Sequence, residues 1–240
     1  MKLRTILSKT VLTAAVALLI ALPAHANIYG QSVTGNDLTD NRSFNSNSYD
    51  PINGSEGGLD GYWPGFNISW DISYDFSSTL WHYEYTLQNS KDISHMILEV
   101  SNTATAGDIQ NFHYSDSGAA FQTGQIEGPT VWTKSGNITM PNSFYGVKFN
   151  VGGNPVVYSF DTHLDPVWGN FFAKDGKDGG DSVYAHNTGL NTSPFNSTDE
   201  LDYIVRPDGG GNPPIVPEPI SSTLFIAGGI AMIARRYLKK

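Results

Sequence analysis

Strict alternation of large apolar and polar residues is the feature that most constrains what this chain can form. From Phe66 to Phe76 every second residue is aromatic or isoleucine, and the residues between them are Asn, Ser or Asp. The segment from Trp81 to Leu87 repeats this pattern with His, Glu and Thr at the alternate positions. Successive side chains of a β-strand point to opposite faces, so both segments are predicted to be half-buried strands.

Shorter runs of the same kind predict further strands. Turn-forming residues separate the runs, and no stretch of the central region shows the 3.6-residue period of an amphipathic helix. Many short strands at close spacing favour an all-β fold, an antiparallel β-sandwich of jelly-roll-like form. The further strands are expected at residues 93–101, 146–151, 156–160, 183–185 and 201–205.

Charge and cysteine usage exclude several classes of function. The chain has a net charge of −9, and the part between Asn27 and Ile215 holds 7 basic and 22 acidic residues, hence −15. Such a surface repels phosphate backbones, so no nucleic-acid partner is expected. The absence of cysteine excludes disulfides, thiol catalysis and thiolate metal sites.

The N-terminus has the three parts of a secretory signal peptide. Three basic residues lie among the first nine, and an apolar run follows at residues 11–22. Ala24 and Ala26 then place small residues where signal peptidase requires them. Residues 1–26 are therefore predicted to be a signal helix that is removed, which leaves Asn27 as the new N-terminus.

The C-terminal region has the pattern of a membrane anchor behind a linker. Residues 207–215 are rich in Pro and Gly, residues 220–234 are uncharged and largely apolar, and Arg235 and Arg236 follow. Fifteen helical residues rise only about 22 Å, which is short for a hydrocarbon core of about 30 Å. We expect a marginal transmembrane helix whose basic end stays in the cytoplasm, while residues 27–206 form a β-sandwich domain outside.

Residues 216–240 resemble the PEP-CTERM sorting signal of Gram-negative bacteria. The resemblance is carried by Pro217, Glu218 and Pro219, by the short apolar helix, and by Arg235 and Arg236. It implies that an exosortase-type enzyme recognises the motif and removes or transfers the tail, so the protein stays only transiently in the inner membrane. It also suggests a link with exopolysaccharide or biofilm matrix.

Two acidic segments are candidates for binding a metal ion. The first holds Asp175, Asp178 and Asp181 among glycines, which suits calcium or an ordinary acidic turn. The second runs from Asp161 to Asp165 and contains His163, which would suit a divalent ion if all three polar side chains shared one face. No other cofactor is expected.

Aromatic and acidic residues suggest two ways of handling polysaccharide. Trp63 and Trp132 lie in loop-like sequence and could stack on sugar rings, although core packing is the alternative. Glu84 and Glu99 lie on successive predicted strands and could act as paired glycosidase carboxylates. Because no other catalytic motif is present, we expect a non-enzymatic envelope or matrix protein; the alternatives are a self-assembling surface protein and a polysaccharide-degrading enzyme.

Overall fold

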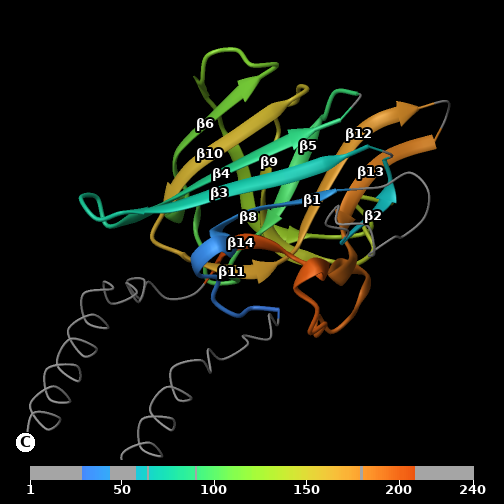
Figure 1. Ribbon diagram of the computed structural model, residues 1–240. Helices are drawn as coiled ribbons and strands as arrows, with labels where there is room; N and C mark the ends of the chain where they lie inside the picture. The colour runs from blue at the N-terminus through green and yellow to red at the C-terminus, as the bar shows by residue number, and fades with distance from the viewer. Residues whose placement is uncertain (1–28, 44–57, 64, 90, 179–180, 209–240) are drawn as a thin grey trace, which may run out of the picture.

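The computed structural model describes residues 29–43, 58–63, 65–89, 91–178 and 181–208, without the side chains of residues 176–178 and 181. This part of the chain forms fourteen β-strands and four short 3-10 turns, and it contains no α-helix. The strands form two six-stranded sheets and one two-stranded sheet, all built from antiparallel pairs (Figure 1). The prediction of an all-β sandwich is therefore confirmed.

The first sheet has the strand order β1-β3-β4-β10-β6-β7. Its two long strands are the alternating segments of the sequence, and Ile68 is paired with Leu87 where they meet. The bounds are β1 (Thr39–Ser43), β3 (Asn67–Asp75), β4 (Leu80–Gln88), β6 (Gln110–Asp116), β7 (Gln122–Thr123) and β10 (Val156–Thr162).

The second sheet has the strand order β2-β13-β12-β5-β9-β8. Its edge strand β8 carries a bulge between Glu127 and Thr130, where Pro129 lies. The bounds are β2 (Leu59–Tyr62), β5 (His95–Glu99), β8 (Ile126–Trp132), β9 (Phe144–Phe149), β12 (Phe171–Asp178) and β13 (Asp181–Asn187).

Aromatic side chains fill the space between the two sheets. Phe149 of the second sheet packs on Tyr158 and Phe160 of the first, with ring centroids 5.2 and 5.7 Å apart. Phe160 also stacks on Tyr83 at 5.3 Å. All four residues are fully buried, so the aromatic members of the alternating strands form the core of the domain.

A small sheet of β11 (Asp165–Gly169) and β14 (Ile204–Asp208) closes one end of the core, at the bottom of the view in Figure 1. The N-terminal segment, residues 29–33, runs antiparallel along the other edge of β11. The amide N–H of Gly30 donates to the Trp168 carbonyl, and the Trp168 N–H donates to Gln31. Tyr85 of the first sheet donates its hydroxyl to the Val205 carbonyl at 2.8 Å, which ties this small sheet to the core.

Two expectations about strand positions need correction. Phe76 follows the alternating pattern but lies beyond the end of β3 and is 67% exposed. Pro207 was expected in a linker, yet it lies in β14 opposite Pro166, because an edge strand tolerates a residue without an N–H. The described residues before Gly61 divide between the two large sheets, since β1 joins the first sheet and β2 the second.

Candidate ligand-binding face

The outer faces of the two sheets differ in what covers them. On the second sheet Ile97 and Phe172 point outward but are fully buried, because Met140, Leu190 and Phe195 from two connecting segments pack over them. On the first sheet the outward residues of β3 and β4 are polar, and each of them is either half-buried or exposed. The first sheet therefore presents the more open face to solvent.

A hollow of about 410 Å³ lies on this open face, over β1, β3 and β4. Pockets for small ligands commonly have volumes of about 300–1,000 Å³. The hollow is lined by Thr39, Asp40, Asn41, Ser69, Trp70, Asp71, Glu84 and Thr86.

Strand register places the polar lining in two rows across the sheet. Thr39 lies opposite Asp71, and Asp71 lies opposite Glu84. The Thr39 hydroxyl donates a hydrogen bond to Oδ1 of Asp71 at 3.0 Å. The carboxylates of Asp71 and Glu84 lie directly opposite each other and repel. This pair therefore lowers the stability of the sheet, whereas a threonine or serine at either position would not.

The side of the hollow toward the core is fixed by aromatic and charged contacts. Trp70 is buried, and its indole N–H donates to the Asp37 carbonyl at 2.9 Å. The buried Arg42 guanidinium lies 5.0 Å from the Trp70 ring and forms an ion pair with Asp40 at 2.7 Å. Because Arg42 balances Asp40, the unbalanced charges of the lining are those of Asp71 and Glu84.

The expected metal site between Asp161 and Asp165 is not formed. Oδ1 of Asp161 lies 2.8 Å from Nδ1 of His82 on the first sheet, whereas Asp165 accepts a hydrogen bond from the Trp81 indole at 3.0 Å. The carboxylates therefore serve different partners. No group of three His, Asp or Glu side chains suitable for a metal ion occurs in the described part of the chain.

The expected calcium segment lies at the paired ends of β12 and β13. Asp175 lies in β12, and Asp178 at the end of β12 is paired with Asp181 at the start of β13. The side chains of Asp178 and Asp181 lie outside the described residues. Calcium binding by these three aspartates stays a prediction.

The suggested pairing of Glu84 with Glu99 is wrong, because β4 and β5 belong to different sheets. Glu84 is half-buried in the lining of the hollow, directly opposite Asp71. Glu99 is 5% exposed and lies among hydrogen-bond donors at the end of the second sheet. The two glutamates share no site.

The two tryptophans proposed for sugar stacking have different positions. Trp63 is 2% exposed and packs on Phe66 with ring centroids 5.0 Å apart, so it is a core residue and the stacking prediction is wrong for it. Trp132 is half-buried on the edge strand β8. Its indole N–H donates to the Gly146 carbonyl at 2.9 Å, and the Lys148 ammonium lies 5.7 Å from its ring.

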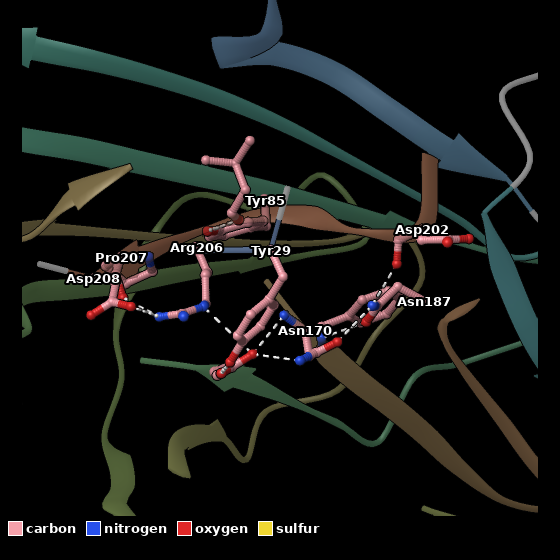
Figure 2. A network of polar contacts seen from close by, with 11 residues as sticks. Tyr29, Tyr85, Asn170, Asn187, Asp202, Arg206, Pro207 and Asp208 are labelled. Atoms are coloured by element: carbon pink, nitrogen blue, oxygen red, sulfur yellow. Dashed lines mark hydrogen bonds and ion pairs between the residues drawn. The ribbon is translucent and has the colours of Figure 1, made fainter. Parts of the chain in front are cut away.

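A buried polar network connects Glu99 to both ends of the domain (Figure 2). Oε2 of Glu99 accepts hydrogen bonds from the backbone N–H and the side-chain amide of Asn170, at 2.8 and 2.7 Å. Oε1 accepts one from the Tyr29 hydroxyl. Nε of the buried Arg206 lies 3.5 Å from Oε2, and Nη1 forms an ion pair with Asp208 at 2.7 Å.

The network continues through a pair of buried amides. The Asn187 side chain donates to Oδ1 of Asn170 at 2.8 Å and to the Asp202 carbonyl at 2.7 Å, as the dashed lines in Figure 2 show. Burial, together with the negative charge of Glu99, raises the pKa of Tyr29 well above its usual range, so its hydroxyl stays protonated. Tyr29, Asn170 and Arg206 all contact the Glu99 carboxylate, and the network therefore fastens the N-terminal segment and β14 to the sandwich.

The predicted targeting residues lie outside the described part of the chain. These are Ala24 and Ala26 of the signal peptide, and Pro217, Glu218, Pro219, Arg235 and Arg236 of the sorting signal. In the residues that the structure describes, no helix is long and apolar enough to cross a membrane.

Comparison of the chain with models of protein families, with curated proteins and with solved structures gave no match.

Proposed function

We propose that this protein is a non-enzymatic component of the cell envelope or extracellular matrix that associates with exopolysaccharide. It is exported by its signal peptide, held briefly in the inner membrane by the helix at residues 220–234, and released to its final site by an exosortase-type enzyme that recognises Pro217, Glu218 and Pro219. We also propose a jelly-roll-like relationship, supported by the repeated crossing of the chain between the two sheets.

The hollow on the first sheet is the observation that carries the association with polysaccharide. Its lining presents hydroxyl, amide and carboxylate groups from three adjacent strands. Groups of these kinds can both donate hydrogen bonds to sugar hydroxyls and accept hydrogen bonds from them. The strands hold them at fixed spacing, so little conformational freedom is lost when a ligand binds.

The edges of the sheets weigh against assembly by strand pairing, which is the main route for the self-assembling alternative. Strand β7 has two residues and β2 has four, and β8 is interrupted by Pro129 and its bulge. Short or interrupted edge strands are the usual protection against edge-to-edge association. Polysaccharide association is therefore the better supported of the two functions.

Intact-mass analysis of the protein from its native envelope and medium tests the route of export. We expect a chain that begins at Asn27 and ends between Val216 and Pro219. A chain that still carries residues 220–240 at steady state would show that the tail is a permanent anchor and would contradict processing.

Incubation with the polysaccharide of the producing cells tests the function itself. We expect the protein to be retained by the polymer without any release of reducing ends. Release of reducing ends that is abolished by Glu84→Gln would contradict a non-enzymatic role and favour the hydrolase alternative.

A further inference from the structure

We propose that the hollow over β1, β3 and β4 binds an uncharged polysaccharide segment and discriminates against acidic polysaccharides. This inference rests on the proposed function and adds to it the position of the site and the class of sugar. It follows from the register, the chemistry and the charge of the lining residues.

The spacing of the lining matches the size of a sugar ring. Neighbouring strands of a sheet lie about 4.8 Å apart, and residues on one face of a strand are about 6.7 Å apart. The row of Thr39, Asp71 and Glu84 therefore spans about 10 Å across three strands, about the length of two sugar rings. The second row consists of Asn41, Ser69 and Thr86, and it lies about 6.7 Å from the first row along the strands.

The lining is rich in acceptors for sugar hydroxyl groups. The carboxylates of Asp71 and Glu84 accept charge-assisted hydrogen bonds, which are about twice as strong as those between neutral groups. One oxygen of Asp71 already accepts from Thr39, whereas no other described residue donates a hydrogen bond to the Glu84 side chain. Glu84 is therefore the acceptor that a bound hydroxyl would use most strongly.

The charge of the lining determines which polysaccharide it accepts. None of the eight residues of the hollow is basic, and Asp71 and Glu84 leave it negative. A uronate, sulfate or phosphate group placed here would face two carboxylates without a cation. Neutral hexose polymers meet no such repulsion.

The absence of an exposed aromatic ring in the hollow indicates weak binding of each segment. The aromatic member of the lining, Trp70, is buried and contributes no open face. A polymer offers many equivalent segments, so retention in a polymer-containing gel is a suitable measurement. Single-oligosaccharide titration would be less sensitive.

Affinity electrophoresis of the full-length protein in detergent tests the inference. The gels contain dextran, soluble mixed-linkage β-glucan or galactomannan as neutral polymers, and alginate as the acidic one. We expect retardation by at least one neutral polymer and none by alginate. Ser69→Tyr fills the hollow and Glu84→Gln removes the strongest acceptor, and each should raise the polymer concentration for half-retardation about tenfold. Ser73→Tyr is the matched control, since Ser73 lies on the same face of β3, opposite His82 and outside the hollow, and it should change that concentration less than about twofold.

The outcomes separate the site from the function. If the wild type is retarded and both Ser69→Tyr and Glu84→Gln behave like it, the hollow is not the site, although polysaccharide association stands. Retardation by alginate but by no neutral polymer would overturn the proposed sugar class, although polysaccharide association would again stand. If no polymer and no native exopolysaccharide retains the wild type, the proposed function fails together with the site.

Discussion

Replacing Tyr29 by phenylalanine tests whether the buried network holds the N-terminal segment in place. The ring contacts remain, because Tyr29 packs on Phe195 and Tyr203 with centroids 5.3 and 5.5 Å away, and the Arg206 guanidinium lies 5.5 Å from its ring. Only the hydroxyl is lost, and with it the donor to Oε1 of Glu99.

The size of the effect follows from the charge and burial of that acceptor. Hydrogen bonds to charged groups contribute about 1.5–3 kcal/mol, and a buried acceptor left without a donor also keeps its desolvation penalty. Glu99 is 5% exposed, so water cannot easily replace the hydroxyl. We expect the free energy of unfolding to fall by about 2 kcal/mol. For a domain of this size this corresponds to a decrease of about 4–8 °C in Tm.

Urea denaturation followed by tryptophan fluorescence measures this change, with linear extrapolation to water. Tyr145→Phe is the matched control, because the Tyr145 hydroxyl donates at 3.1 Å to the neutral Ala104 carbonyl and its loss should cost only about 1 kcal/mol. In a Glu99→Gln background the cost of Tyr29→Phe should shrink by about 1 kcal/mol or more, since the charged acceptor is already absent. Equal costs for Tyr29→Phe and Tyr145→Phe, with no coupling to Glu99, would refute the reasoning.

Three further changes have defined outcomes. Burial, with a contribution from two nearby lysines, lowers the pKa of His95 from 6.5 to about 4. The unfolded chain therefore binds a proton that the folded protein does not. The free energy of unfolding found above pH 6.5 decreases by up to about 3 kcal/mol as the pH falls toward 4. In the His95→Gln variant the urea midpoint should depend less on pH over this range. A methyl group at Gly169 would lie 1.9 Å from Nε of Arg206, so Gly169→Ala should displace the buried guanidinium and cost about 3 kcal/mol in the same urea assay; an unchanged midpoint would contradict this. Trp63→Ala should cost about 3–5 kcal/mol in thermal unfolding yet leave retardation by neutral polymers unchanged at temperatures where it is folded; selective loss of retardation would restore Trp63 as a sugar-binding residue.

The sequence predicts the central strands of the sandwich well, because their burial differs between the two faces. In β3 and β4 one face carries aromatic and aliphatic residues and the other carries short polar ones, so the period is unambiguous. In β5 the pattern fails, since Met96 faces the main core while Ile97 on the other face is also buried under Met140 and Leu190. A strand covered on both faces shows no alternation.

The candidate site was only partly predictable, because it combines segments far apart in the chain. The sequence places Glu84 in an alternating strand, but its neighbours Thr39 and Asn41 come from a polar region without an alternating pattern. The inward residue of that strand is Arg42, whose burial is compensated by Asp40 and by cation–π contacts with Trp70 and Trp168. Hydrophobic periodicity gives no signal for a strand whose buried residue is an arginine.

Tryptophan in a loop was a misleading indicator of ligand binding. Trp63 follows β2 directly and turns inward onto Phe66, where the gap between the sheets accommodates a large ring. The polar network was equally hidden, since Tyr29, Glu99, Asn170 and Arg206 have no recognisable spacing. The pairing of residues 30–33 and of β14 with β11 brings Tyr29 and Arg206 to the Glu99 carboxylate.

The arrangement around β11 also determines how the domain responds to a pulling force. Residues 30–33 and β14 both run antiparallel to β11, so they are parallel to each other on its two sides. The N-terminal segment enters beside Trp168, while β14 leaves beside Asp165, at the opposite end of β11. A load between the two ends acts along the strands, perpendicular to their hydrogen bonds. All the bonds of each pair then share the load instead of opening one after another, so the domain should resist mechanical extension in this direction more strongly than peeling from the edge strand β8.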